Sequence, residues 1–268
     1  MGSQAVAAQG AIRFPFGHNW RRFLERVDED RVATAQASLG RLLESAELDG
    51  KSFLDVGSGS GLFSLAARRL GARVRAFDDD PESVACAQAL AERFAPGDEQ
   101  WSIERGSVLD PDYTASLGRF DVVYAWGVLH HTGEMYLALE RTAALVADGG
   151  RLCVSIYNDQ GLLSTYWRAV KFLYNRRPLL QPLLIALHAP YLLGLRLLLR
   201  ALSGRLREAR GMAYWHDLLD WLGGYPFEVA RPDQIVTFLE RRGLHLAALH
   251  RVHGNRSGCN EFVFRRPG

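Results

Sequence analysis

Short apolar runs alternate with segments of helical periodicity through most of the chain. Leu62, Leu65, Ala66 and Leu70 recur on one helix face, and Gly71 follows where helices often end in the left-handed conformation. Apolar runs without this period predict strands. The predicted strands begin at 53, 73, 101, 120, 151, 244 and 261, and further helices are predicted at 134–146 and 232–242. This order predicts an α/β fold.

The turn after the first predicted strand contains three alternate glycines. Residues 53–61 read Phe-Leu-Asp-Val-Gly-Ser-Gly-Ser-Gly, so Asp55 lies two residues before Gly57. Glycine permits positive φ and lets a ligand approach the main chain without meeting a Cβ. A dinucleotide fingerprint would place its third glycine at position 62, which is Leu62. The loop therefore predicts a nucleoside-type ligand but argues against a nicotinamide oxidoreductase.

The pattern resembles motif I of the class I S-adenosylmethionine-dependent methyltransferases. The resemblance implies a Rossmann-like seven-stranded sheet with helices on both faces, here with a helical insert after strand 5. It also implies S-adenosyl-L-methionine as cofactor and S-adenosyl-L-homocysteine as product. Asp55 and the Gly57 carbonyl would bind the ammonium end, Ser58 lies between the glycines, and Gly59 and Gly61 would make room for the cofactor body.

The second strand ends in an acid. Asp78 lies about twenty residues beyond the glycine loop, where nucleoside-binding folds carry a carboxylate for the ribose hydroxyls. Asp79 is its neighbour and belongs to the same predicted cofactor site. Asp80, Pro81 and Glu82 have the pattern of a helix start, with an N-cap, a proline and an acid in the first turn.

Two later segments complete the predicted cofactor site. The family usually has Gly-Asp after the third strand, whereas this chain has Gly106 followed by Ser107. The adenine contact would come from the Ser107 hydroxyl, the Val108 backbone or Asp110, and the sequence does not choose among them. The fourth strand leads into Trp126, in a segment that the resemblance places between cofactor and acceptor.

Length and cysteine usage define the class of protein. A chain of 268 residues accommodates one α/β domain with an insertion. We expect cap helices at 1–45, the cofactor-binding core at 46–160, an insert forming a lid or acceptor pocket at 161–230, and the last core helix and strands at 231–268. Three cysteines without Cys-x-x-Cys spacing and no signal peptide pattern predict a cytoplasmic protein without a metal site.

The segment after the fifth strand differs in charge from the rest of the chain. Between Gly161 and Gly211 it has nine basic residues and one acid, Glu208, whereas the net charge of the whole chain is +2. Leucines dominate residues 179–199, but two prolines, His188 and Arg196 make a membrane-spanning helix a poor interpretation. Two interpretations remain: an interfacial amphipathic helix pair at a membrane, or a helical lid or dimer contact with solvated arginines.

Candidate catalytic residues lie in two places. His131 follows the fourth strand, where the acceptor should lie, and a histidine near pKa 6.5 can take a proton from an oxygen nucleophile. His130 is expected to pack inward. His216, Asp217 and Glu228 are reserve candidates in an aromatic segment that follows the insert. Because many members of the family act by positioning alone, these residues could equally be structural.

A short aromatic segment precedes the fold. Residues 16–20 read Phe-Gly-His-Asn-Trp, and similar chains carry such a segment as a cap over the cofactor. We therefore include Trp20 among the predicted cofactor contacts. The alternative is a surface arm with exposed aromatic side chains.

The resemblance implies a small-molecule methyltransferase, similar to the polyprenyl-hydroxyphenol or quinol O-methylases. We expect methyl transfer to a hydroxyl oxygen by in-line attack on the sulfonium methyl, with N-methylation or a catalytically inactive cofactor-binding regulator as alternatives. The acceptor would be a small molecule, and a lipophilic acceptor would suit the leucine-rich insert. The sequence has no pattern of nucleic-acid recognition. Peripheral membrane contact through residues 161–211 and a monomer or homodimer complete these expectations.

Overall fold

A mixed seven-stranded sheet forms the centre of the molecule. The computed structural model describes residues 14, 20, 23–44, 48–190, 221–252 and 258–268. The strand order is β3-β2-β1-β4-β5-β7-β6, and β7 runs antiparallel to both of its neighbours. The strands are β1 Ser52–Val56, β2 Arg73–Asp78, β3 Trp101–Arg105, β4 Phe120–Trp126, β5 Val146–Tyr157, β6 His245–His250 and β7 Cys259–Arg265. The seven-stranded α/β fold predicted from the sequence is therefore confirmed.

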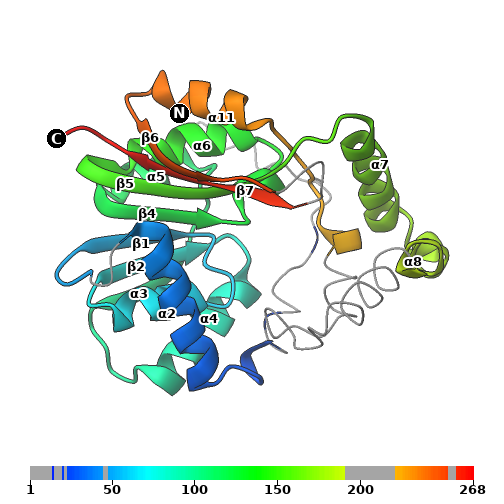
Figure 1. Cartoon of the computed structure of the whole chain (residues 1–268). Coiled ribbons are helices and arrows are strands. Elements are labelled where there is room, and N and C mark those ends of the chain that lie inside the picture. The colour runs from blue at the N-terminus through cyan, green and yellow to red at the C-terminus, as the bar shows by residue number, and fades with distance from the viewer. Residues whose placement is uncertain (1–13, 15–19, 21–22, 45–47, 191–220, 253–257) are drawn as a thin grey trace, which may run out of the picture.

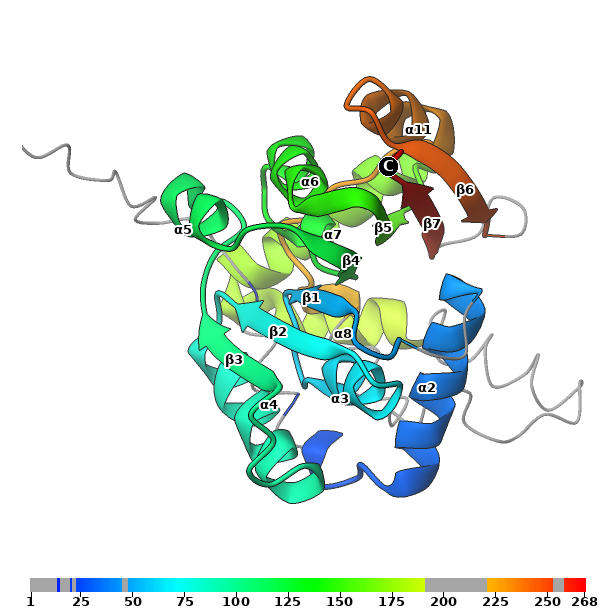
Figure 2. The ribbon, with the colours of Figure 1, turned by 90° about the vertical axis from the view of Figure 1, so that its left-hand side faces the viewer.

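Helices cover both faces of the sheet (Figures 1 and 2). One face carries α2 Glu29–Leu43, α3 Leu62–Arg69 and α4 Pro81–Phe94, and the other carries α5 Pro111–Ser116, α6 Met135–Ala144 and α11 Pro232–Glu240. The insert contributes α7 Leu162–Arg176, the short 3₁₀ helix η2 Pro178–Leu180 and α8 Gln181–Ala189. In Figure 1, α7 and α8 lie beyond the carboxyl end of β5.

The helix signals in the sequence correspond to observed caps. Asp80 is the N-cap of α4, and its Oδ1 accepts a hydrogen bond from the Glu82 amide at 2.9 Å. Gly71 follows α3 with φ of +94°, a conformation that glycine adopts without a Cβ penalty. The buried face of α2 includes Val32, Leu39 and Leu42, as its periodicity indicates.

One predicted boundary is wrong. The turn predicted at residues 148–150 before strand 5 lies inside β5, which begins at Val146. The β4–β5 register moves from Phe120 paired with Val146 to Val122 paired with Arg151, so the extra residues bulge out of the ladder. The bulge persists because Gly149 takes φ of +74° and its amide bonds to the Arg266 carbonyl of the C-terminal segment.

Gly61 allows a helix to approach the glycine loop. A Cβ at this position would lie 2.9 Å from the Ala87 Cβ of α4, and φ is +78°. The space beside Gly61 is therefore occupied by α4, whereas the sequence interpretation assigned it to the cofactor body. The glycine sets the distance between the loop and the helix that follows β2.

Replacing Gly61 by alanine should destabilise the protein more than the same change at Gly97. Both glycines have positive φ, but a Cβ at Gly97 would meet no atom within 4 Å. Gly97→Ala should cost about 1 kcal/mol for the backbone conformation, and Gly61→Ala about 1–3 kcal/mol more for the contact with α4. The free energies of unfolding in urea measure both costs. Equal costs for the two variants would contradict the packing role of Gly61.

Candidate cofactor and acceptor site

Two acids lie beneath the glycine loop, at the carboxyl ends of β1 and β2. Asp55 is buried, and its Oδ2 accepts a hydrogen bond from the Ser64 hydroxyl at 2.5 Å. Asp78 accepts two backbone hydrogen bonds, from the Gly59 amide at 2.9 Å and from the Asp80 amide at 3.0 Å. Parallel strands bring both side chains to one edge of the sheet, as the sequence predicts for a ligand site.

Both acids resist ionisation. Burial raises the pKa of Asp55 to about 7, although the hydrogen bond from Ser64 acts in the opposite direction. Burial also raises the pKa of Asp78 to about 6, against the lowering effect of its two backbone hydrogen bonds. The charge of Asp78 further disfavours the ionised form of Asp55. A cation bound beside this pair would therefore be stabilised more strongly than one beside solvated carboxylates.

The loop offers main-chain access and one buried hydroxyl. Gly57 has φ of +69°, and a Cβ there would collide with the Val128 side chain. A Cβ at Gly59 would lie 3.0 Å from the Trp20 ring, so this indole covers the loop. Within the described part of the chain, the buried Ser58 Oγ has no hydrogen-bond partner. Small residues and an unsatisfied hydroxyl beside two acids suit a compact, cationic nucleoside.

Two N-terminal aromatic residues pack against different segments, Trp20 against the glycine loop and Phe14 against Gly223. Trp20 is half-buried, and its carbonyl accepts a hydrogen bond from the Cys86 thiol at 3.2 Å. Phe14 is also half-buried, and its amide donates to the Tyr225 carbonyl at 3.0 Å. The alternative of an arm with exposed aromatic side chains therefore does not hold for these two residues.

The predicted ribose and adenine residues have different surroundings. Asp79 is exposed beside Asp78. Asp110 is the N-cap of α5 and accepts from the Asp112 and Tyr113 amides, which gives it a structural role among the three adenine alternatives. Ser107 is half-buried at the start of the same turn, whereas the Val108 side chain belongs to the core.

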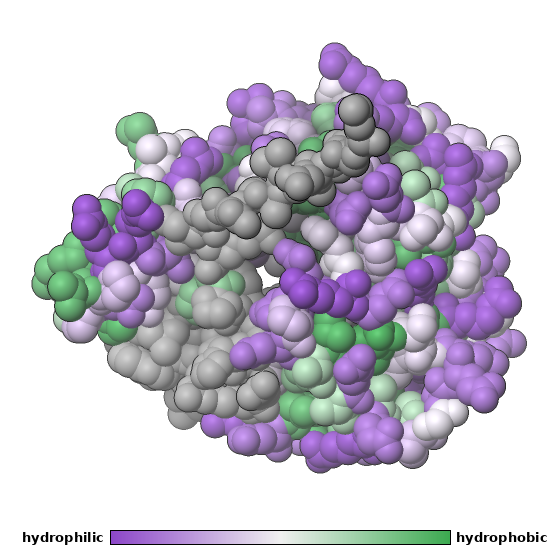
Figure 3. Space-filling model, turned by 180° about the vertical axis from the view of Figure 1, so that it is seen from behind, coloured by the Kyte–Doolittle hydropathy of each residue, from purple (hydrophilic) through white to green (hydrophobic). Residues whose placement is uncertain are grey.

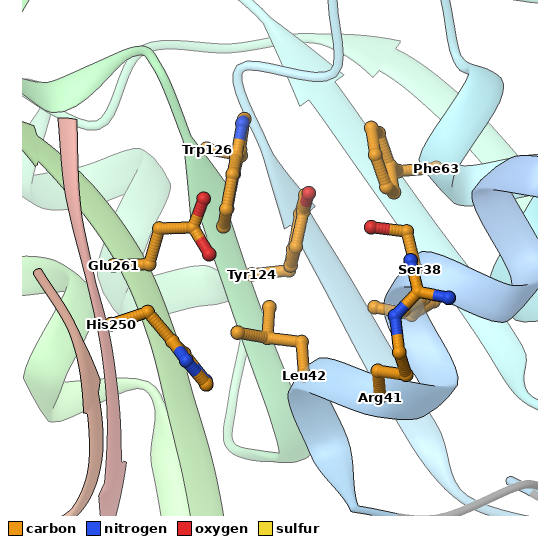
Figure 4. Close-up of a pocket in the computed structure, with 9 residues that line it drawn as sticks. Ser38, Arg41, Leu42, Phe63, Tyr124, Trp126, His250 and Glu261 are labelled. Carbon is orange, nitrogen blue, oxygen red and sulfur yellow. The ribbon is translucent and has the colours of Figure 1, made fainter. Parts of the chain in front are cut away.

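Trp126 projects from the face of the sheet that α2 covers, the same face from which Asp55, the partner of Tyr124 in the β1–β4 ladder, projects. Its ring lies parallel to that of Tyr124, with 5.8 Å between centroids. Both rings border a cavity between α2, β4 and the β6–β7 edge (Figure 4). The position at the end of β4 agrees with the sequence, but the direction of the ring does not follow from it.

The two histidines after β4 lie in the 3₁₀ helix η1, Leu129–His131. His130 is buried, as expected, with Nδ1 3.2 Å from the Ser155 carbonyl. His131 Nδ1 lies 2.7 Å from the Pro226 carbonyl, which requires the proton on Nδ1 and leaves the lone pair on Nε2. The loss of solvation around His131 lowers the pKa of its imidazole to about 3. Such an imidazole orients a hydroxyl well but is a weak proton acceptor.

Of the three reserve catalytic candidates, only Glu228 lies among the described residues. Both carboxylate oxygens of Glu228 accept from the Met135 amide, at 3.3 and 3.1 Å, so Glu228 caps α6. Burial raises the pKa of this carboxyl. The structure thus gives Glu228 a structural role that the sequence interpretation did not consider. His216 and Asp217 lie outside the described residues.

Three polar side chains of α7, which the sequence interpretation missed, fasten the segment that holds His131. Asn175 Nδ2 donates to the Gly223 carbonyl at 2.7 Å, and Arg168 Nε donates to the Phe227 carbonyl at 3.2 Å. The buried Lys171 donates to the Trp221 carbonyl. These residues recur at positions i, i+3 and i+7, so they share one face of the helix. This spacing was the signal in the sequence that could have identified them.

A known protein family matches most of the chain. Residues 27–246 match the family described as "Methyltransferase domain". The ubiquinone biosynthesis O-methyltransferase of Nitrobacter winogradskyi is 32% identical over 111 residues, which cover 41% of this chain and 40% of that protein. The enzyme of the same description from Cupriavidus pinatubonensis is 32% identical over 134 residues, covering 49% and 51%. The chain thus spans about half the length of these curated relatives.

Solved structures share the fold at low sequence identity. Magnesium protoporphyrin IX methyltransferase from Synechocystis PCC 6803, with bound SAH, superposes with a TM-score of 0.56 at 17% identity over 93% of this chain and 94% of that chain. An O-methyltransferase family protein from Burkholderia thailandensis gives a TM-score of 0.57 at 15% identity, over 94% and 61%. These likenesses concern the fold.

Replacing Asp55 by asparagine should stabilise the ligand-free protein at high pH. From its ordinary value of 3.8 upward, Asp55 ionises in the unfolded chain, whereas the folded chain keeps the proton until about pH 7. The contribution of this group to stability therefore falls as the pH rises from about 4 to about 7. Asp55→Asn should raise the free energy of unfolding at pH 8 by about 1–4 kcal/mol and leave it unchanged near pH 4.

Urea unfolding at pH 4 to 8 measures this difference. Asp148→Asn is the control because Asp148 is exposed and faces Arg119 at the surface. An equal or lower stability of Asp55→Asn at pH 8 would contradict the buried, protonated state of Asp55.

Proposed function

Because the chain belongs to the methyltransferase-domain family, whose methyl donor is S-adenosylmethionine, we propose that it methylates a hydroxyl oxygen of a small molecule. The observation that carries the donor site is the pair of buried acids under the glycine loop, with pKa values raised to about 7 and about 6. Partial similarity to ubiquinone biosynthesis O-methyltransferases favours oxygen as the accepting atom. Methylation of a nitrogen is the alternative.

We assign the donor's contacts to the residues around the glycine loop. Asp55 and the Gly57 carbonyl would attract its ammonium group, and Asp78 with its neighbour Asp79 would hold the ribose hydroxyls. Ser58 Oγ, which bonds to no other described residue, would contribute a hydrogen bond to the donor. Trp20, Gly59, Ser107 and Val108 would enclose the rest of the nucleoside.

The chemistry asks little of the protein beyond alignment. The donor supplies an electrophilic methyl group on a positively charged sulfur. Positioning the acceptor oxygen in line with that methyl accounts for most of the expected rate increase. His131, held by the Pro226 carbonyl, would help to orient the acceptor hydroxyl. With a pKa of about 3 it would act by orientation, and we expect no loss of rate from its protonation between pH 5 and 8.

S-Adenosylmethionine should bind more tightly as the pH rises from 5.5 to 7.5. Ionisation of Asp55 and Asp78 in this range supplies the negative charge that favours the donor, so binding should release protons. We expect an increase of at least about fivefold in affinity, well below the tenfold per pH unit that one fully coupled proton allows. Titration calorimetry in two buffers of different ionisation enthalpy measures both the affinity and the proton release.

Two controls make this measurement specific. Asp78→Asn should lower the affinity and reduce the pH dependence, whereas Asp148→Asn should change neither. Tight binding of NAD with none of S-adenosylmethionine would reject the donor assignment. Labelled methyl transfer to matched panels of hydroxylated and amino compounds then tests the accepting atom, and methylation of amines alone would contradict oxygen.

We further propose that α8 contacts an anionic membrane that delivers a lipophilic acceptor. Leu179, Leu183 and Leu187 recur every four residues and are 96%, 64% and 66% exposed. Figure 3 shows hydrophobic surface at the left margin, where α8 lies. Residues 161–190 contain no acid, and Arg176 and Arg177 precede the leucine stripe, which suits anionic lipid. Among the described residues no helix is long and apolar enough to cross a membrane.

Polar substitutions in the leucine stripe should weaken membrane binding. The double variant Leu183→Gln and Leu187→Gln should reduce partitioning onto anionic vesicles at least about tenfold, because each buried leucine contributes about 1.5–3 kcal/mol. Leu137→Gln on α6, which changes a leucine that is 38% exposed, is the control. Co-sedimentation at low and high salt measures the partitioning, and the absence of binding at both salts would reject the membrane contact.

A further inference from the structure

Four side chains form a row across neighbouring strands on the face of the sheet that α2 covers. Trp126 of β4 pairs with Ser155 of β5, Ser155 pairs with Glu261 of β7, and Glu261 pairs with His250 of β6. Paired residues project from the same face of a sheet, so the four side chains lie side by side. An aromatic ring, a hydroxyl, a carboxylate and an imidazole are thereby brought together from four strands.

Three members of this row, Trp126, Glu261 and His250, line a cavity of about 230 Å³. The opposite wall comes from α2 and α3 (Figure 4). The cavity is lined by Ser38, Leu39, Arg41, Leu42, Phe63, Tyr124, Trp126, His250 and Glu261. In Figure 4 the His250 ring points into the cavity from β6, and Arg41 lies on the far side, on α2.

Three stacked aromatic rings form an apolar wall of the cavity. The rings of Tyr124 and Trp126 are inclined by only 3°, and the Phe63 ring lies within 30° of both, 5.2 Å from Tyr124 and 6.4 Å from Trp126. Aromatic side chains favour an aromatic ligand because rings pair in edge-to-face or offset-stacked arrangements. The volume lies between the roughly 150 Å³ of a cavity that holds benzene and the roughly 300 Å³ lower limit of drug-sized pockets. One substituted aromatic ring therefore fits.

The carboxylate of Glu261 indicates which substituent an aromatic ligand in this cavity would carry. Glu261 is half-buried, and an ionised carboxylate only accepts hydrogen bonds, with about four acceptor positions. A ligand that uses it must bring an O–H or N–H donor, and a hydrogen bond to a charged acceptor is stronger than one to a neutral group. An ether or a hydrocarbon in the same place would lack this bond.

The cavity also adjoins the glycine loop. Phe63 lies two residues beyond Gly61, and Trp126 lies two residues before Val128, whose side chain contacts Gly57. A ring on this aromatic wall therefore lies beside the loop to which we assign the methyl donor.

We propose that this cavity binds the aromatic ring of the methyl acceptor and that Glu261 selects acceptors whose ring carries a hydroxyl or amino group. The description of the ligand as the methyl acceptor rests on the proposed function. The cavity itself, and its preference for an aromatic ring with a hydrogen-bond donor, do not depend on the proposed function. Glu261 is thus a residue that determines specificity.

Phenol, anisole and cyclohexanol probe this preference without methyl transfer. Anisole lacks the donor, and cyclohexanol lacks the aromatic ring. NMR titration of the ligand-free protein, observing the indole N–H of Trp126 and the amide of Glu261, gives a dissociation constant for each probe. We expect both signals to shift with phenol, and phenol to bind at least about fivefold more tightly than either other probe, as one charge-assisted hydrogen bond allows.

Glu261→Gln should remove this preference. Glutamine keeps the shape of the side chain but loses its charge. The affinity for phenol should therefore fall to that for anisole, and the affinity for anisole should not change. Glu99→Gln is the control because Glu99 is exposed. Should Glu261→Gln fail to fold, Ser38→Leu on α2, which fills the opposite wall, should weaken all three probes.

Equal affinities of phenol and anisole for the unaltered protein, or no shift of the Trp126 signal, would overturn the proposal. Calorimetry with S-adenosylmethionine on the same samples separates the two hypotheses. Loss of donor binding with intact phenol selectivity would reject the proposed function but not the cavity. Intact donor binding without phenol selectivity would reject the cavity alone.

Discussion

The carboxylate of Asp78 holds the turn on which the rest of the site depends. It accepts the Gly59 amide, while the Phe77 carbonyl beside it accepts the amides of Gly57 and Ser58. Three consecutive loop amides are therefore fixed by the end of β2. This bonding sets where α3 begins and how closely α4 approaches, which is why residues without a Cβ are needed at the positions that meet Trp20, Val128 and α4.

The same arrangement has an energetic cost. Among the described residues, Asp55 lies behind the turn without a cationic partner, and its burial opposes ionisation, as it does for Asp78. Structures store such unfavourable electrostatics where a ligand is to relieve them. The backbone of the loop is thus fixed by hydrogen bonds, while the two acids beneath it gain from a nearby positive charge. This combination suits recognition of a cation.

The proposed acceptor side is assembled from distant parts of the chain. η1 after β4 presents His131, the segment 221–230 supplies the Pro226 carbonyl that fixes its tautomer, and α7 fastens that segment through Lys171 and Asn175. Trp126, at the end of β4, shares a cavity with Glu261. The insert therefore supports the segment that holds His131, and it also offers the exposed leucines of α8.

The sequence by itself determined the succession of strands and helices along the chain, the helix caps and the glycine loop beside Asp55, because these follow from local periodicity and from glycine spacing. It placed His131 and Trp126 at the right strand end. Only the tertiary structure decided that Glu228 caps α6, that Gly61 faces α4 and that Glu261 joins Trp126. Side-chain direction, burial and pKa depend on residues far apart in sequence, and no local pattern records which of them meet.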